Sequence, residues 1–147
     1  MTKEMIAACL MAAANHYDVP PAVMVGIMHV EGGRVGQEVA NKNGSYDLGP
    51  MQINTIWLPQ LAGLWKKDVA SARMAVRDNA CVNVYVAAWI LRQTYQRTGT
   101  LWGAIAHYHS ATPWRGEAYA QKVVTAMHRY GLIKDDSALK PQKLAQR

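Results

Sequence analysis

The sequence predicts an all-α protein with a single domain. Apolar residues recur at spacings of three and four residues through nearly all of the 147-residue chain, which is the period of amphipathic helices. No alternation of apolar and polar residues, as expected of a strand, continues for more than a few residues. Half of the residues are hydrophobic, and a chain of this length buries most of the surface that its unfolded state exposes. One packed core is therefore expected.

Two helices are expected at the N-terminal end of the chain. The first covers residues 2–16, and a proline pair at 20–21 separates it from the second, because proline is tolerated in a first helical turn and pushes its predecessor into an extended conformation. The second helix covers residues 22–31 and is mostly apolar until it ends in Glu31. A glycine pair at 32–33 is expected to end this helix as a left-handed cap.

The middle of the chain is expected to be a long loop followed by a short helix. Residues 32–49 are rich in glycine, asparagine and serine, which favour turns. Long loops in compact domains are often functional. A short helix is expected over 51–64, bent or ended near Pro59.

The strongest helix is expected in the second half of the chain. Asp78 is the expected N-cap of a helix over 79–96 that Gly99 closes, and the wide apolar arc of this helix predicts a central position. Further helices are expected over 101–107 and 114–130.

The domain is expected to span residues 1–133, and residues 134–147 are expected to form a polar, flexible tail. The apolar run over 5–14 is expected to belong to the first helix rather than to a signal peptide, because Glu4 offsets the charge of Lys3.

Charge is unevenly distributed along the chain. Residues 71–147 carry 11 Lys/Arg and 4 Asp/Glu, whereas residues 1–70 carry 5 and 6. A basic surface attracts any polyanion, so charge alone does not select a partner. No Lys/Arg cluster lies on one short helix and no recognition motif is present, so no nucleic acid partner is expected. No apolar stretch approaches the roughly 20 residues that a membrane-spanning helix needs, so no stable membrane insertion is expected.

The cysteines and histidines leave one question open and suggest no metal site. Cys9 and Cys81 are far apart, and from the residues alone they are either a disulfide or two buried thiols. His107 and His109 are two residues apart, but no spacing matches a known zinc pattern and neither cysteine has a nearby CxxC partner. We expect no metal and no cofactor.

Glu31 is the candidate for acid catalysis. Cleavage of a glycosidic bond requires a carboxylic acid that stays protonated near neutral pH. Glu31 ends an apolar helix, where burial and the negative end of the helix dipole both disfavour the carboxylate. A glutamate near a helix end is more often simply solvated, so its position alone does not establish catalysis.

A segment around Gln52, 21 residues after Glu31, favours a catalytic role for Glu31. It runs Asp-Leu-Gly-Pro-Met-Gln-Ile-Asn over residues 47–54. The order of an apolar helix ending in Glu, a polar loop, a Gly-x-Met-Gln-Ile-Asn stretch and a later tyrosine-containing turn resembles the soluble lytic transglycosylases. Over residues 9–130 the chain is more similar to the small specialised members that accompany conjugation and type III and type IV secretion systems.

The resemblance implies a lysozyme-like fold with a substrate groove and assigns several site residues. Glu31 matches the catalytic glutamate of the family. Gly49, Met51 and Gln52 match its second motif, and Tyr108 matches the tyrosine of its third. Gln52, Met51 and Tyr108 are expected to line the groove, with Tyr108 bonded to a sugar acetamido group or to Glu31.

Further positions are weaker matches or departures from the family pattern. Ser45 and Asn43 lie where the loop of the family approaches the sugar. Gly32 stands where Ser usually follows the catalytic Glu, and Pro50 stands where Leu is usual. His109 replaces the asparagine of the third motif, as in the specialised members, and is expected to take over as a donor to the sugar.

The resemblance also implies chemistry and location. Glu31 is expected to protonate the oxygen between N-acetylmuramic acid (MurNAc) and N-acetylglucosamine (GlcNAc), and then to deprotonate the 6-hydroxyl, giving a 1,6-anhydro sugar. A Cys9–Cys81 disulfide, a periplasmic or exported location, and peptidoglycan strands and conjugation or secretion proteins as partners follow from the same resemblance.

Two alternatives remain at this point. In a hydrolysing muramidase on the same fold, Asp47 would activate a water molecule in place of the 6-hydroxyl. In a non-catalytic accessory, the chain would bind glycan and recruit secretion-machine subunits, although Glu31 together with the Gln52 motif argues against this.

Overall fold

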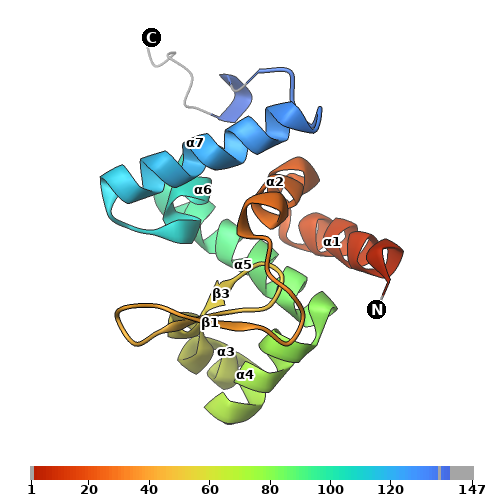
Figure 1. Ribbon diagram of the computed structural model, residues 1–147, viewed down its shortest axis with the longest axis vertical. Coiled ribbons are helices and arrows are strands. Elements are labelled where there is room, and N and C mark those ends of the chain that lie inside the picture. Colours follow the sequence, from red (N-terminus) through yellow and green to blue (C-terminus); the bar gives the residue numbers. More distant parts are fainter. Residues whose placement is uncertain (1, 136, 140–147) are drawn as a thin grey trace.

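Helices make up most of the computed structural model, which describes residues 2–135 and 137–139 (Figure 1). The α-helices of this part are α1 Lys3–Tyr17, α2 Pro21–Glu31, α3 Leu58–Trp65, α4 Val69–Asp78, α5 Ala80–Thr98, α6 Leu101–His109 and α7 Pro113–Arg129. Two short 3₁₀ helices are η1 Thr55–Trp57 and η2 Ser137–Leu139. The predicted all-α class is confirmed.

Helix α5 lies at the centre of the fold, as its wide apolar arc predicts. It packs against α1, α4 and α6, and most of its first three turns are buried. Its N-cap is Asn79, whose side chain accepts a hydrogen bond from the Val82 N–H at 3.1 Å, and not Asp78 as expected. Asp78 is instead the last residue of α4. Gly99 ends α5 in the left-handed conformation, as predicted.

Helix α4 was not expected from the sequence. Asp68 caps it, because its carboxylate accepts a hydrogen bond from the Ser71 N–H at 2.7 Å. Only Ala72 and Val76 of this helix are buried. Val69, Ala72 and Val76 stand at spacings of three and four residues, so the helical period of α4 is present in the sequence although the prediction left this segment out.

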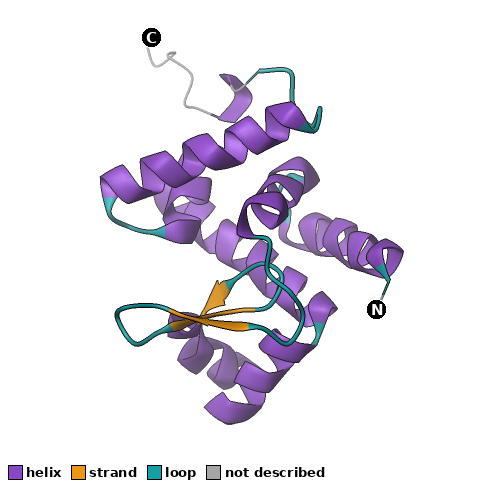
Figure 2. Cartoon of the chain, viewed as in Figure 1, coloured by secondary structure: helices purple, strands orange, loops and turns teal. Residues whose placement is uncertain are grey.

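The expected loop over 32–49 contains an antiparallel hairpin (Figure 2). Strand β1 (Glu38–Ala40) pairs with β2 (Tyr46–Leu48), and β2 pairs with β3 (Ile53–Asn54), so the sheet order is β1-β2-β3. The expected helix over 51–64 therefore begins later, at Leu58. Strands of two and three residues are too short for alternation to appear in the sequence.

The hairpin is bonded to α4 through Glu38. The guanidinium of Arg73 donates two hydrogen bonds to the Glu38 carboxylate, at 2.7 and 2.9 Å, and Arg77 donates a third at 3.0 Å. Arg73 also lies over the ring of Tyr46, 4.8 Å from its centroid. The bond from Arg73 is the main reason that the pKa of Glu38 is lowered. These contacts fix the hairpin relative to the helical part of the fold.

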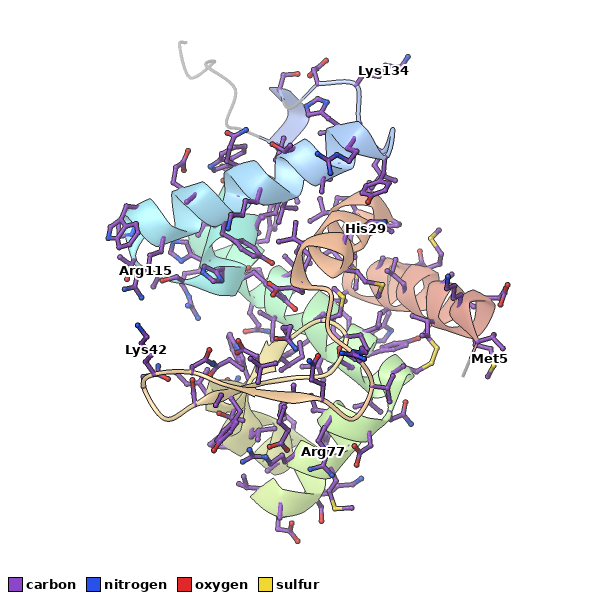
Figure 3. All side chains as sticks on the ribbon, in the orientation of Figure 1. Met5, His29, Lys42, Arg77, Arg115 and Lys134 are labelled. Carbon is purple, nitrogen blue, oxygen red and sulfur yellow. A yellow bond between two sulfur atoms is a disulfide. The ribbon has the colours of Figure 1, made fainter. Side chains whose placement is uncertain are left out.

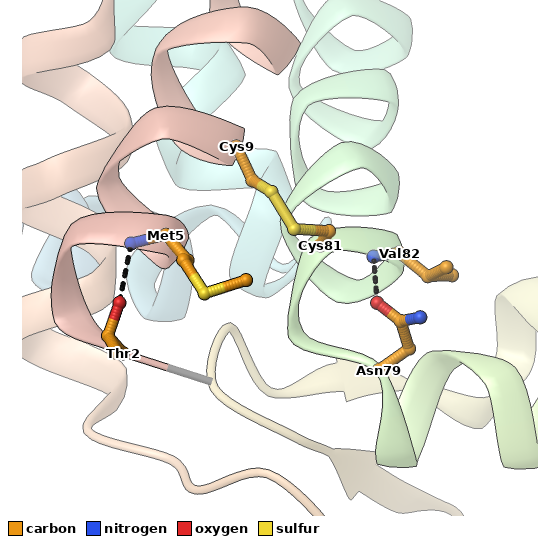
Figure 4. The surroundings of a disulfide bond; sticks show 6 residues. All are labelled: Thr2, Met5, Cys9, Asn79, Cys81 and Val82. Atoms are coloured by element: carbon orange, nitrogen blue, oxygen red, sulfur yellow. Dashed lines mark hydrogen bonds between the residues drawn. A yellow bond between two sulfur atoms is a disulfide. The ribbon is translucent and has the colours of Figure 1, made fainter.

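A disulfide between Cys9 and Cys81 joins α1 to the first turn of α5 (Figure 4). The two Cα atoms are 5.4 Å apart and the cysteines are 72 residues apart in sequence. The pairing implied by the family resemblance is therefore present. On the chain-entropy model, closing a loop of this length stabilises the fold by roughly 4 kcal/mol.

The predicted tail is described only in part, because residues 136 and 140–147 lie outside the described residues. Leu139, in η2, is 5% exposed and belongs to the core cluster. Among the described residues, none of the helices combines the length and the apolar character needed to cross a bilayer.

The side-chain amide of Asn83 lies in the core at the junction of α5, α4 and the sheet. It is fully buried. Its Oδ1 accepts a hydrogen bond from the Met51 N–H at 2.8 Å, and its Nδ2 donates to the carbonyls of Leu48 and Val76 at 2.8 and 3.0 Å. One amide thus satisfies three backbone groups from separate segments, which leaves none of these groups unpaired in the core.

We expect Asn83→Leu to lower the free energy of unfolding by about 3 kcal/mol or more, because the three backbone groups would be buried without partners. Asn83→Asp keeps the acceptor for Met51 but removes both donors, and should also destabilise the fold. Urea unfolding followed by circular dichroism measures both. Gln96→Leu, on the exposed side of α5, is the matched control and should change stability by less than about 0.5 kcal/mol. Equal losses in the Asn83 and Gln96 variants would contradict this role.

Candidate active site

Glu31 is the last residue of α2 and lies where α2 meets the loop that leads to the hairpin. Met24 and Ile27, about two turns and one turn before Glu31, are fully buried and anchor the helix. Gly32 ends α2 in the left-handed conformation, with φ of 59°, as the glycine pair predicts. The buried residues of α2 therefore hold the Glu31 side chain next to the core.

Among the described residues, the hydrogen-bond partner of the Glu31 carboxylate is Tyr119 of α7. The Tyr119 hydroxyl donates to Glu31 Oε2 at 2.5 Å, and the tyrosine is 5% exposed. Tyr119 shares one face of α7 with Val123 and Met127, and these two residues pack on Gly26 of α2. A Cβ at Gly26 would lie 2.6 Å from Met127, so the small residue lets the helices approach closely.

Tyr119 is not predicted from the sequence as a site residue. Its spacing of four residues from Val123 is the signal of a core position, which is what Tyr119 also is. The functional part is its hydroxyl, and periodicity carries no information about that atom.

The pKa of Glu31 is raised to about 7. Burial is the main cause, and the nearby negative charge of Asp47 adds to it, while the Tyr119 hydrogen bond and the positive charge of Lys122 act in the opposite direction. At neutral pH both protonation states of Glu31 are therefore populated. A group with such a pKa can give up a proton and take one back in the same reaction cycle.

Tyr108, on α6, donates its hydroxyl hydrogen bond to the carbonyl of Met51 at 2.8 Å. Its ring lies nearly parallel to that of Tyr119, with centroids 6.5 Å apart. Of the two bonds expected of Tyr108, to a sugar acetamido group or to Glu31, the bond to Glu31 is absent among the described residues, where Tyr119 bonds Glu31 instead. The bond to an acetamido group stays a prediction. Burial and the charges of Glu31 and Asp47 raise the pKa of Tyr108, so its hydroxyl stays protonated at neutral pH.

Met51 was expected to line the groove, and this expectation is corrected. Its side chain is 0% exposed and belongs to the core. What Met51 contributes towards the site is its backbone, which is bonded to Asn83 on one side and to Tyr108 on the other. Gln52 is partly exposed, and its Nε2 donates to the carbonyl of Gly49 at 3.0 Å, so its side chain is folded over its own turn.

Gly49 has a structural reason to be glycine. Its φ is 68°, and a Cβ at this position would collide with the amide nitrogen of Asn83. The second motif is therefore a turn that rests directly on α5.

Gly33 brings this turn to the catalytic candidate. Its N–H donates to the carbonyl of Pro50 at 3.3 Å, and a Cβ at Gly33 would collide with the carbonyl oxygen of Gly49. The chain just after Glu31 thus touches the turn at residues 49–52 directly. The structure thus brings the segment that follows Glu31 against the second motif.

Ser45 and Asn43 lie in the turn between β1 and β2 and are bonded to each other. The Ser45 hydroxyl donates to Asn43 Oδ1 at 2.6 Å. The side chain of Asn54 donates to Ser45 Oγ and to Asp47 Oδ1, both at 3.0 Å, which links the turn to Asp47. No hydrogen bond joins Ser45 or Asn43 to Glu31 among the described residues, so their contact with a sugar stays a prediction.

His109 flanks the site from the end of α6. Its ring stacks on that of Tyr119, with centroids 4.5 Å apart and planes 8° from parallel, while the residue remains exposed. Partial loss of water around the imidazole, which Tyr119 covers on one face, is the main cause that lowers the pKa of His109, although the charge of Asp47 opposes it. His109 therefore covers one face of the tyrosine that bonds Glu31.

No metal site is evident in the part of the chain that the structure describes, where no three His, Cys, Asp or Glu side chains gather as a metal ion requires.

Three relatives are similar to this chain over much of its length. A "Peptidoglycan-binding-like protein" of Escherichia coli O157:H7 is 25% identical over 142 residues, which cover 90% of this chain and 83% of the relative. "Invasion protein IagB" of Salmonella typhi is 30% identical over 143 residues, with 92% and 82% covered. "Protein IpgF" of Shigella flexneri is 28% identical over 105 residues, with 71% and 66% covered.

A family model gives the assignment. The model described as "Transglycosylase SLT domain" matches residues 8–125, a span that contains Glu31, the turn at 49–52, Tyr108 and Tyr119. The resemblance to the lytic transglycosylases is thereby confirmed, and the seven helices of the described chain agree with the lysozyme-like fold of that family. The chain belongs to the transglycosylase SLT domain family.

Proposed function

We propose that the protein is a peptidoglycan lytic transglycosylase that cleaves the β-1,4 bond between MurNAc and GlcNAc and forms 1,6-anhydro-MurNAc. Glu31 acts first as the acid and then as the base. The observation that carries this proposal is the Glu31 carboxyl group, with a pKa of about 7 and a hydrogen bond from Tyr119. Membership of the SLT family supports it.

The acid step follows from how the two carboxyl oxygens of Glu31 are used. Oε2 accepts the hydrogen bond from Tyr119, which leaves Oε1 to hold the acidic proton. Burial and the nearby charge of Asp47 favour this protonated form. Glu31 gives its proton to the glycosidic oxygen, the bond from C1 of MurNAc to that oxygen breaks, and GlcNAc leaves with a free hydroxyl.

The base step returns the proton to Glu31. The carboxylate formed in the first step is stabilised by the Tyr119 hydroxyl, whose own pKa is raised, so that Tyr119 stays a donor. The 6-hydroxyl of MurNAc gives its proton to Glu31, and its oxygen bonds to C1 to close the anhydro ring. No water is consumed, and the enzyme ends in its starting protonation state.

The acetamido group of the substrate acts in place of a second carboxylate, because it stabilises the positive charge at C1 of MurNAc. Gln52, Ser45, Asn43 and His109 are the proposed sugar contacts, at the edges of the turn, the hairpin and α6. Tyr108 is proposed to form a wall of the site, with its hydroxyl held by Met51.

Asp47 supports an alternative, a hydrolysing muramidase. Its charge acts on Glu31, Tyr108 and His109, so it lies near the site. As a base it would activate water to attack C1. Asn54 donates a hydrogen bond to Asp47 Oδ1. We favour the route through the 6-hydroxyl because the chain belongs to the transglycosylase SLT domain family.

The proposed role is to open the cell wall locally for a conjugation or secretion apparatus, in the periplasm or after export. The Cys9–Cys81 disulfide fits an oxidising compartment, and one relative is named an invasion protein. A non-catalytic accessory that binds glycan is the alternative from another class of function. The raised pKa of Glu31 favours the enzyme over the accessory.

Incubation of purified peptidoglycan with the protein should release muropeptides that are lighter by one water molecule than their hydrated forms, as mass spectrometry measures. Glu31→Gln keeps the shape of the side chain but removes the transferable proton, and should lower product release by a factor of about a thousand or more. Hydrated, reducing-end products would establish the muramidase instead. No products from either protein would favour the accessory.

Activity should fall as the pH rises through about 7, because kcat/KM requires the protonated form of Glu31 in the free enzyme. The Tyr119 hydrogen bond lowers the pKa of Glu31, so Tyr119→Phe should move this fall to higher pH and lower kcat by about tenfold or more. A pH profile of anhydro-product formation measures both effects. Tyr95→Phe on α5 is the control, and an unshifted profile in Tyr119→Phe would refute the coupling.

A further inference from the structure

Three rings lie nearly parallel next to the Glu31 carboxyl. Tyr119, on α7, stacks on His109 at the end of α6, with ring centroids 4.5 Å apart and planes 8° from parallel. The ring of Tyr108, the residue before His109, has its centroid 6.5 Å from that of Tyr119 and lies 14° from parallel. The hydroxyl of Tyr119 donates to Glu31 Oε2 at 2.5 Å. The ring that bonds the catalytic candidate is thus in face-to-face contact with a histidine from another helix.

The two rings of the closer pair differ in their exposure to water. Tyr119 is buried, whereas His109 is exposed. Because the two rings lie face to face, His109 separates this face of Tyr119 from the solvent. Water that reached this face would compete with the tyrosine hydroxyl for the carboxylate, since a protein hydrogen bond always exchanges with bonds to water. The histidine ring therefore shields the hydrogen bond that Glu31 accepts.

The corner between α6 and α7 holds His109 in this place. Gly116 of α7 packs against the end of α6, where a Cβ on the glycine would lie 3.1 Å from the Cβ of Ala106. The indole N–H of Trp102, in the first turn of α6, donates to Glu117 Oε2 of α7 at 2.8 Å. A small residue and a hydrogen bond thus fix the two helices against each other, and with them the last residue of α6.

The imidazole of His109 is mostly neutral at pH 7. Partial loss of water is the main cause that lowers its pKa, and the charges of Lys122 and Arg115 add to this, while the charge of Asp47 opposes it. Figure 3 shows Arg115 in the first turn of α7. A neutral ring adds no positive charge near the Glu31 carboxyl, so it is compatible with the raised pKa of that group.

The dipole of α6 does not explain this arrangement. A histidine in the last turn of a helix is favourable when it carries a positive charge. His109 is in that turn, but its ring is mostly neutral at pH 7 and lies flat on Tyr119. The helix would gain as much from a histidine that pointed into the solvent.

We propose that His109 is a positioning residue, whose ring face holds Tyr119 in place and keeps water away from the hydrogen bond between Tyr119 and Glu31. This inference rests on the function proposed above, in which that bond stabilises the carboxylate of Glu31 between the acid step and the base step. For this role His109 does not touch the reacting atoms. The edge of its ring, which carries both nitrogens, stays available for the sugar contact proposed above.

Two replacements separate the face of the His109 ring from its edge. His109→Phe keeps a flat ring without a hydrogen-bond donor, whereas His109→Asn keeps a donor without a ring. The kcat for release of anhydro products should fall by about fivefold in His109→Asn and stay within about twofold of wild type in His109→Phe. A loss of kcat in His109→Phe as large as that in His109→Asn would overturn the proposal.

A double-mutant cycle tests whether His109 acts through Tyr119. In the Tyr119→Phe protein the hydroxyl is already absent, so adding His109→Asn should lower kcat by less than about twofold. A further loss of about fivefold in this background would show that His109 acts independently of Tyr119 and would overturn the proposal. His128→Ala, which removes an exposed histidine near the end of α7, is the control and should leave kcat unchanged.

The shielding is tested without catalysis, by NMR of the Tyr119 hydroxyl proton. A proton in a short bond that water does not reach exchanges slowly, and Tyr119→Phe identifies its signal by loss. The proton should exchange about tenfold faster or more in His109→Asn, and as slowly as in wild type in His109→Phe. Equal exchange in His109→Asn and wild type, or no signal in wild type, would overturn the proposal. Absence of anhydro products from the wild type would instead refute the proposed function, while this measurement still decides the role of His109.

Discussion

The buried amide of Asn83 fixes the relation between the helical part of the molecule and its hairpin. Three backbone groups, from the end of β2, the turn after it and α4, take their hydrogen bonds from this one side chain. The turn held in this way bonds Tyr108 through Met51 and approaches Gly33 just beyond Glu31. A shift of the turn would therefore displace both walls of the site at once, which makes Asn83 a positioning residue for the catalytic candidate.

The site is built at a cost to stability. Burial of the Glu31 carboxyl disfavours its charged form, and α2 places it at the negative end of a helix dipole, which adds to the same effect. Tyr119 offsets part of this by donating to the carboxylate, and the close packing of α2 on α7 at Gly26 keeps the two side chains in contact. The result is a carboxyl group poised near neutral pH.

The sequence predicts the helices and the catalytic candidate better than it predicts the surroundings of that candidate. Helices with wide apolar faces, such as α2 and α5, are evident from their spacing, and the turn at 49–52 is evident from its motif. The hairpin is missed because strands of two or three residues have no period, and it is stabilised by distant partners such as Arg73. Tyr119 is missed because a functional hydroxyl on a core side chain looks like any other core position.

The most direct test of this account is the titration of Glu31 itself, followed by the chemical shift of its side-chain carboxyl carbon in NMR. Glu31→Gln identifies the signal by its loss. The account predicts a midpoint near pH 7, well above the 4.5 of an ordinary glutamate. A midpoint near 4.5 would mean that Glu31 is ionised at neutral pH and has no proton to give, which would contradict its role as the acid.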